Sequence, residues 1–318
     1  MRIGQPLRYA RDRLIRARVI YTRVIRTCVI RISVIVALLL GQPLAAFAQV
    51  SARPGPSPTG PYYDRSFVLA ADQKCRLFQP LVVSALTAAT LQARGAAVRH
   101  GATPQDLAAT AGRAAARANQ TSCDDPQLTM VKGRVAAAFA GWAGTPRMTF
   151  PGIRTAWYGD RYGLVGPGWR LKQTVRTGQA PVGFGLVGDA GHGETLAAVV
   201  TFVGRSRPYA ARLVLRDTER APRPWLTGTA AGDLPPEGLR RVVFSAGSEE
   251  AAEGLLLPGR EDGQAWKFPD TAADLIAALD PREVFAVEFL FMDDSVARAT
   301  FEAGDFAAGR AFVDMGSL

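Results

Sequence analysis

Apolar residues recur at helical spacing in the part of the chain that follows residue 70. The first predicted helix runs from Asp72 to about Gly95. Its apolar face is formed by Leu77, Leu81, Ala85, Ala88 and Leu91. Pro80 lies inside this segment, so it either kinks the helix or marks its start.

Two further helices are expected downstream. Thr103 followed by Pro104 is typical of a capped helix start, and this second helix is expected to reach about Asn119. A third helix is predicted from Gln127 to Ala140. The first two helices are joined by a short loop, so they are predicted to form an antiparallel hairpin.

Short runs of β-forming residues replace the helical spacing after Gly141. The candidate strands are Trp169–Val175, Thr195–Val203, Ala210–Arg216, Arg241–Phe244, Gln264–Phe268, Val284–Met292 and Val296–Glu302. A helix capped by Asp270 is expected over 272–279, and a last helix over 305–314. The loop at 204–208 is expected to be a hairpin loop. The predicted class is α+β, with helices packed on an antiparallel, sandwich-like β part.

The last two strands allow a prediction of register. A two-residue turn at Asp293-Asp294 would place the apolar residues of one strand opposite polar residues of the other. The reason is that a register shift of one residue moves all side chains of a strand to the other face of the sheet. A three-residue loop from Asp293 to Ser295 aligns the faces. The pairs then expected are Phe291 with Ala297, Phe289 with Ala299, and Val287 with Phe301.

The N-terminal segment has the three parts of a secretory signal. Arginines come first, an apolar run follows from Ile32 to Leu40, and small residues surround Phe47 at Ala46 and Ala48. The apolar run is shorter than the roughly 20 residues that span a bilayer. Cleavage is expected between Ala48 and Gln49, which predicts a periplasmic or secreted protein. The alternative is an uncleaved membrane anchor, and the true start of translation is left open.

Charge is concentrated in this leader. Residues 1–48 hold nine arginines and one acid, Asp12, whereas the whole chain has a net charge of +10. The remaining chain is therefore only slightly basic, and no nucleic-acid partner is expected. The predicted organisation is a signal over 1–48, a proline-rich tether over 49–63, a helical part over 64–143 and a β-rich part over 144–318.

Two of the three cysteines remain after the leader. Cys75 and Cys123 are an even pair in an oxidising compartment, so a disulfide is expected between them. The alternatives are two free thiols or a metal site. A zinc site usually has closely spaced cysteines or histidines, and the sequence has neither here. No metal and no cofactor is expected.

The segment 142–170 is rich in aromatic residues and arginines, and it is the candidate ligand surface. The residues assigned to it are Trp157, Tyr158, Tyr162, Trp169 and Arg161. Exposed rings beside arginine suit a glycan or a protein partner. The alternative is that the rings form the seam between the helical and β parts.

Other motifs carry less weight. Gly183 to Gly188 spells G-x-G-x-x-G, but no helix is expected to follow, so a glycine-rich β loop is favoured over a dinucleotide site. His192 lies near Asp189 and Glu194, which allows a base and its orienting carboxylate. No G-x-S-x-G nucleophile accompanies them, so no catalytic residue is assigned.

The closing order of helix, strand pair and the sequence from Gly304 to Phe312 resembles exported bacterial proteins of the invasion-associated locus B type, over about 194–314. The resemblance implies a sandwich-like, non-enzymatic envelope protein. The leading hypothesis is therefore a periplasmic binding or structural protein with an envelope protein or glycan as partner. The alternatives are an envelope hydrolase using His192 and a glycan-binding module.

Overall fold

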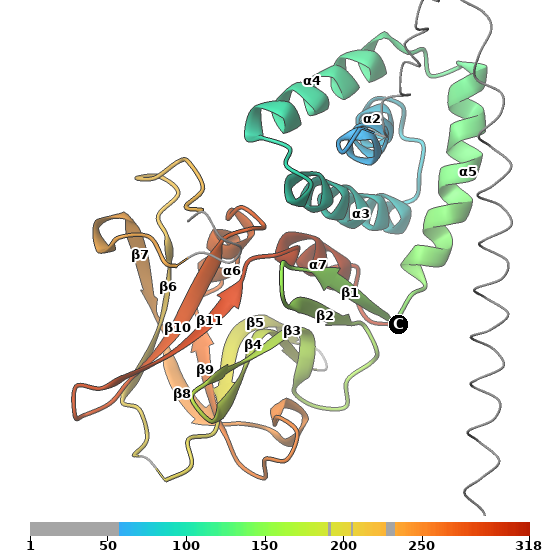
Figure 1. The fold of residues 1–318 in the computed structure, drawn as a ribbon. Helices are drawn as coiled ribbons and strands as arrows, with labels where there is room; N and C mark the ends of the chain where they lie inside the picture. Colours follow the sequence, from blue (N-terminus) through green and yellow to red (C-terminus); the bar gives the residue numbers. More distant parts are fainter. Residues whose placement is uncertain (1–56, 190–191, 205, 227–232) are drawn as a thin grey trace, which may run out of the picture. The chain divides into compact units, whose positions relative to one another are not determined.

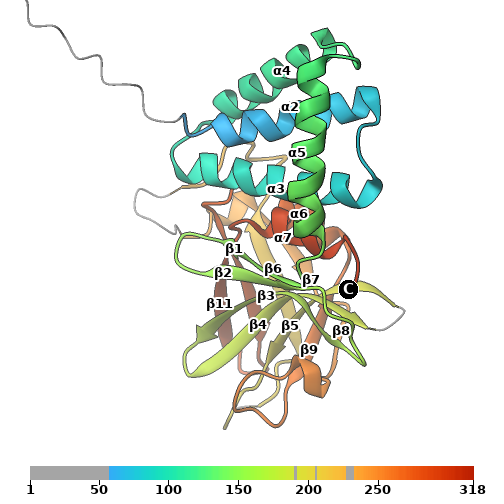
Figure 2. The ribbon, with the colours of Figure 1, turned by 90° about the vertical axis from the view of Figure 1, so that its right-hand side faces the viewer.

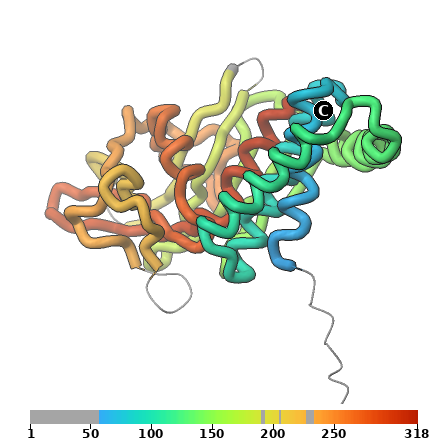
Figure 3. The backbone as a smooth tube through the Cα atoms, turned by 90° about the horizontal axis from the view of Figure 1, so that it is seen from above, coloured from blue at the N-terminus to red at the C-terminus, as the bar shows by residue number. Residues whose placement is uncertain are grey.

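The computed structural model describes residues 57–189, 192–204, 206–226 and 233–318 (Figure 1). The predicted leader, its cleavage site and residues 49–56 of the tether lie outside this part of the chain. The side chain of His192 lies outside it as well. In the views of Figures 2 and 3, helices α2 to α5 gather on one side and the strands on the other.

Four helices open the described chain: α2 (Gly60–Cys75), α3 (Pro80–Arg99), α4 (Pro104–Gln120) and α5 (Pro126–Ala143). Each has a proline in its first turn, where the missing N–H costs no helical hydrogen bond. Thr103 and Asp106 form a reciprocal capping box at α4. The Asp125 side chain accepts a hydrogen bond from Gln127 N at α5.

The single helix predicted from Asp72 to Gly95 is wrong. Arg76 has a left-handed backbone with φ of 51°, and it ends α2. The alternative, that Pro80 starts a helix, is the observed one. Helix α2 begins within the predicted tether and mixes polar with apolar residues, so it has no clear apolar stripe.

The predicted disulfide is present. Cys75 and Cys123 have a Cα–Cα distance of 5.6 Å and are joined by an S–S bond of 2.03 Å. Cys75 is the last residue of α2, and Cys123 follows the end of α4, so the bond joins the ends of these two helices. The Lys74 ammonium supports the junction by donating to the carbonyl oxygens of Asn119 and Thr121.

Eleven strands of the described chain form two antiparallel sheets. The seven-stranded sheet has the order β1 (Arg147–Pro151), β2 (Ala156–Asp160), β3 (Gly168–Thr177), β4 (Ala180–Asp189), β5 (His192–Val200), β9 (Gln264–Phe268) and β8 (Gly247–Glu250). The four-stranded sheet has the order β11 (Val296–Glu302), β10 (Val284–Leu290), β6 (Ala210–Arg216) and β7 (Arg240–Phe244). The short helices α6 (Thr271–Ala277) and α7 (Phe306–Val313) complete the β part.

The two sheets pack face to face around an aromatic core. The Phe184 ring of β4 lies 5.2 Å from that of Phe285 on β10 and 5.1 Å from that of Phe301 on β11. All three side chains are fully buried. The class is therefore α+β with a β-sandwich, as predicted. The loop at 204–208 joins the two sheets, so its predicted role as a hairpin loop is wrong.

The predicted faces of β10 and β11 are correct, but their register is shifted by two residues. Phe289 lies opposite Ala297, and Val287 lies opposite Ala299. The three-residue loop is Met292 to Asp294, closed by a hydrogen bond from Phe291 N to Ser295 O of 3.0 Å. Asp294 adopts φ of 60°, the left-handed residue that ends such a loop. A shift of two keeps each side chain on its face.

The G-x-G-x-x-G sequence lies inside strand β4 and not in a loop. Each glycine makes room for a close neighbour. A Cβ on Gly185 would lie 1.8 Å from the Leu171 carbonyl oxygen, where β3 carries a bulge. A Cβ on Gly183 would lie 3.0 Å from the Trp169 indole, and one on Gly188 3.1 Å from Arg170. Packing explains this motif without a nucleotide.

Candidate functional site

The aromatic segment 142–170 divides between core and surface. Trp157 is fully buried, and its indole N–H donates to the carbonyl oxygens of Glu302 and Ala303 at 3.1 and 3.0 Å. Arg161 is also buried and donates to the carbonyl oxygen of Ala143 at 2.7 Å and to that of Gly316 at 2.7 Å. The assignment of Trp157 and Arg161 to an exposed ligand surface is therefore wrong.

Three residues of that predicted surface remain accessible. Tyr158 and Tyr162 are exposed, and Trp169 is half-buried with its indole N–H donating to the Leu255 carbonyl oxygen at 3.1 Å. The Arg147 guanidinium lies 4.7 Å from the centre of the Tyr162 ring.

The His192 region contains two carboxyl groups with a raised pKa, Glu194 and Asp314. His192 opens β5 opposite Asp189, and the position of its side chain lies outside the described residues. Burial raises the pKa of Glu194 to about 7, and the Asp314 charge adds to the shift, while Arg170 and Arg310 partly oppose it. This cluster therefore supplies two candidate proton carriers, Glu194 and Asp314.

The other polar motifs have structural roles. His100 is exposed at the C-terminal end of α3, and Asp293 accepts hydrogen bonds from the backbone and hydroxyl of Ser295. Within the described ranges, no group of three or more histidine, cysteine or acidic side chains is arranged to hold a metal ion.

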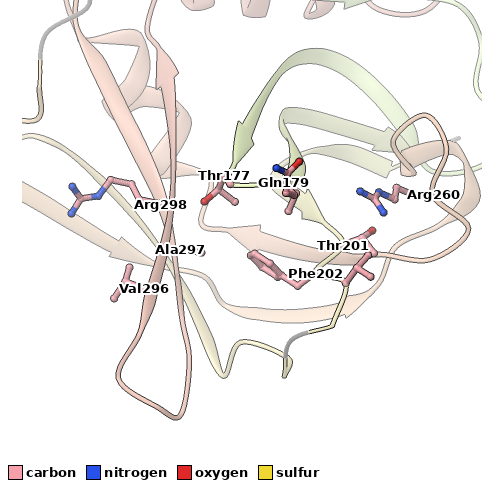
Figure 4. Close-up of a pocket in the computed structure, with 11 residues that line it drawn as sticks. Thr177, Gln179, Thr201, Phe202, Arg260, Val296, Ala297 and Arg298 are labelled. Carbon is pink, nitrogen blue, oxygen red and sulfur yellow. The ribbon is translucent and has the colours of Figure 1, made fainter.

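A cavity of about 320 Å³ opens at the end of the sandwich where the β3–β4 hairpin meets β11 (Figure 4). We call it the mouth cavity. Four separate segments line it: 177–180, 201–203, residue 260 and 296–298. This size lies near the lower end of the range for small-molecule sites, and the mouths of β-barrels and sandwiches often hold such sites.

The floor of the mouth cavity is apolar. Phe202 follows β5 and packs edge-on against Phe289 at 5.4 Å and Phe291 at 5.2 Å between ring centres. Ala180 and Ala297 are buried beside it. These contacts anchor the Phe202 ring to the core, so the floor is preformed.

The rim is polar and is built by two tight turns. Thr177 pairs with Ala180, so Gly178 and Gln179 form a two-residue hairpin turn, with Gly178 at φ of 55°. Gly259, at φ of 76°, turns the second loop and places Arg260 at the rim. In Figure 4 the Arg260 side chain points from its loop toward Gln179.

The part of the lining formed by described residues contains two arginines and no acidic residue. Arg298 is already paired with Glu288 at 2.7 Å, and Figure 4 shows it pointing away from the cavity. Arg260 is half-buried, and its guanidinium makes no hydrogen bond or ion pair with any other residue in the described part of the chain. Among the residues that the structure describes, the mouth cavity therefore has one unpaired positive charge above an aromatic floor.

Two smaller cavities have a different character. One of about 210 Å³ shares Thr201 and Phe202 with the mouth cavity but includes Glu250 and Asp262. The other, of about 190 Å³, lies between α2, α4 and α5 and is lined by Tyr63, Phe67, Arg117, Thr121, Asp125, Gln127, Leu128 and Val131. Each includes acidic side chains, so neither combines an aromatic floor with an unopposed cation.

Sequence reasoning missed the mouth cavity, because no local spacing links its four segments. The glycine turns at Gly178 and Gly259 were the only local signals, and turns of this kind are common. No known family model, curated protein or solved structure matches the chain. Among the described helices, α3 is long and apolar enough to cross a membrane, but half of its apolar window is buried in the protein.

Proposed function

We propose that this chain is an exported envelope protein that binds a small molecule in the mouth cavity and performs no chemistry on it. The single observation that carries the proposal is the half-buried Arg260, without a partner in the described chain, at the rim of a preformed cavity with an aromatic floor. Export is supported by the leader over 1–48 and by the Cys75–Cys123 disulfide.

The composition of the lining supports binding over catalysis. Among the described residues, its hydrogen-bonding side chains are threonines, one glutamine and two arginines, with no histidine, cysteine, lysine or carboxylate. General base catalysis requires a group of suitable pKa within hydrogen-bond reach of the reacting atom. The eleven lining residues provide no such group. The polar side chains among them can orient a bound ligand by hydrogen bonds, and the apolar ones can contact its apolar part.

The binding test uses the full chain, secreted with its leader and purified from the periplasm of a Gram-negative host. Neutral, anionic and cationic fragments are screened by ligand-observed NMR. Thr177→Trp places an indole in the mouth cavity, because Thr177 lies on the same inward face of β3 as Gln173 and Val175, and it is expected to abolish the binding of the fragment hits. Thr174→Trp is the matched control, since Thr174 is an exposed residue on the opposite face of the same strand and lies outside the mouth cavity.

Loss of binding in Thr177→Trp alone, with binding kept in Thr174→Trp, supports the proposal. Fragments that bind both variants equally, or the absence of any fragment that binds the wild-type chain, overturn it. The same preparation tests export: mass spectrometry of the periplasmic protein is expected to show Gln49 as the first residue. Retention of residues 1–48 in the cytoplasm contradicts the export part of the proposal.

The raised pKa of Glu194 favours one alternative, an envelope hydrolase using His192 with Asp189 or Glu194. This alternative predicts hydrolysis of ester or amide substrates that is lost in His192→Ala. The proposed binding function predicts equal background rates of hydrolysis for the wild-type chain and for His192→Ala.

The second alternative is a glycan site on the 142–170 segment, where Tyr158, Tyr162 and Trp169 are the accessible side chains of the predicted surface. It predicts that the wild-type chain binds to a glycan array and that Tyr158→Ala weakens this binding.

A further inference from the structure

We infer that the mouth cavity takes an anion, a carboxylate or a phosphate monoester, attached to a small apolar or aromatic body. This inference rests on the proposed function and specifies its ligand class. It is carried by the charge of the lining, the pairing of the other arginines and the shape of the floor.

Arg260 differs from the comparable arginines of the β part. Within the described residues 147–318, every other arginine that is not exposed either donates to a carbonyl or carboxylate oxygen or forms an ion pair, as Arg241 does with Glu219 at 3.8 Å. Arg216 pairs with Glu283 at 2.6 Å, and Arg282 pairs with Asp280 at 2.9 Å. A guanidinium that is partly withdrawn from water gains most from a charged acceptor, because charge-assisted hydrogen bonds are the strong ones. Arg260 has no such acceptor among the described residues.

The acids nearest in sequence do not neutralise Arg260. Glu261 and Asp262 follow it directly, yet neither forms an ion pair with it, and both are exposed. Asp262 contributes to the neighbouring 210 Å³ cavity and not to the mouth cavity. The Arg260 side chain points toward Gln179 at the rim of the mouth cavity (Figure 4).

Polar groups around Arg260 complete an oxyanion site. In Figure 4 the Gln179 amide lies opposite the guanidinium, and Thr177 stands at the same rim. An amide N–H and a hydroxyl both donate hydrogen bonds, and the planar guanidinium offers a fork that matches two oxygens of one carboxylate or phosphate. These donors suit a ligand that accepts hydrogen bonds and carries negative charge.

The floor determines the rest of the ligand. Phe202, Ala180 and Ala297 form an apolar base, and the cavity volume is about 320 Å³. A phenyl ring or a short alkyl chain on Phe202 buries apolar surface while the anionic group reaches the rim. Free inorganic phosphate lacks this apolar part, so it is expected to bind more weakly than an aryl or alkyl derivative.

The test compares matched probes by isothermal titration calorimetry on the full chain purified from the periplasm. The probes are 3-phenylpropionate, its neutral amide 3-phenylpropionamide, and phenyl phosphate. The wild-type chain is expected to bind at least one anion about tenfold or more tightly than the amide. Arg260→Gln is expected to remove that preference and to leave amide binding unchanged.

Arg207→Gln is the control, because Arg207 is an exposed arginine of the neighbouring 210 Å³ cavity and lies outside the mouth cavity. Its removal is expected to leave all affinities within about twofold, since exposed charges interact weakly through water. An equal loss in Arg207→Gln overturns the inference, because it indicates a general electrostatic effect.

The remaining outcomes separate the two proposals. Equal binding of anion and amide, unchanged in Arg260→Gln, overturns the anion inference and leaves the small-molecule function standing. No binding of any probe or library fragment overturns both. Tighter binding of phenyl phosphate than of 3-phenylpropionate supports a phosphate ligand, and the reverse order supports a carboxylate.

Discussion

Arg99 and Asp305 form a two-pronged ion pair that joins the end of α3 to the start of α7, although they are 206 positions apart in the chain. The distances are 2.6 Å from Nη1 to Oδ1 and 2.9 Å from Nη2 to Oδ2. The exposed fractions of the side chains are 16% for Arg99 and 1% for Asp305. The pair therefore ties the helical part to the β-sandwich.

Removing Arg99 is expected to destabilise the chain strongly. Burial raises the pKa of Asp305, and the Arg99 guanidinium opposes this shift. Arg99→Leu leaves the buried carboxyl group without its cation, at a cost of about 3–5 kcal/mol. Urea unfolding of this variant measures the loss. Arg134→Leu on the exposed surface of α5 is the control and is expected to change stability by less than about 0.5 kcal/mol.

Gly95 is expected to be intolerant of a methyl group. Alanine is normally about 1 kcal/mol more favourable than glycine inside a helix. In α3, however, a Cβ at position 95 would lie 1.8 Å from Oδ1 of Asp305. Gly95→Ala is therefore expected to lower the unfolding free energy by about 1–3 kcal/mol.

The matched control is Gly112→Ala in α4, where the Cβ meets nothing within 4 Å. This variant is expected to raise the midpoint of thermal unfolding. If Gly95→Ala is also stabilising, the close packing of α3 against α7 is refuted.

The disulfide is expected to contribute substantially to stability. It closes a loop of 48 positions, which corresponds to about 4 kcal/mol in the chain-entropy account. The variant with Cys75→Ala and Cys123→Ala is expected to unfold at lower urea concentration than the oxidised wild type. Reduction with dithiothreitol is expected to reproduce this shift in the wild type and to leave the double variant unchanged. Equal midpoints for oxidised and reduced wild type contradict a structural role.

Glu194 is expected to make stability depend on pH. Its pKa is raised from 4.5 to about 7, so the folded state holds this proton more tightly than the unfolded state. The stability linked to that proton is fully present below about pH 4.5 and is lost as the pH rises toward 7. Glu194→Gln cannot ionise, so it is expected to be more stable than wild type at pH 8 by about 1–2 kcal/mol, discounted for partial exposure.

Urea unfolding at pH 4, 5.5, 7 and 8 checks this dependence. The difference between Glu194→Gln and wild type is expected to be near zero at pH 4 and largest at pH 8. Glu253→Gln, an exposed residue that opens a short 3₁₀ turn, serves as the control and is expected to show no such trend. A difference that is the same at all four pH values rejects the raised pKa.

Local patterns in the sequence were sufficient for several elements. The bounds of β6, β9 and β11 agree with the predicted strands, because alternating or continuous apolar residues end at clear turn residues. The faces of β10 and β11 were also predictable, since a two-residue period allows only two orientations. The exact pairing was not, because the left-handed Asp294 moves the loop by one residue toward Met292.

Elements without a local pattern were missed. Strand β4 is a run of valines, leucine, phenylalanine and glycines that shows no alternation, because the glycines face Trp169 and the Leu171 carbonyl. The sequence also did not show which aromatic side chains of the segment 142–170 are buried and which are exposed. Trp157 is core and Tyr158 is surface because alternate residues of β2 point to opposite faces of its sheet.

The sequence by itself determined the α+β class, the pairing of Cys75 with Cys123 and the position of most strands, because these follow from spacing, redox chemistry and local turns. Only the tertiary structure decided which charged groups are paired and which are free. Arg99 forms an ion pair with Asp305, which lies far away in the sequence. Arg260 instead lines a cavity whose other walls come from three segments that are distant in the sequence. Pairing in space depends on how the sheets and helices close, and residue order along the chain does not specify that.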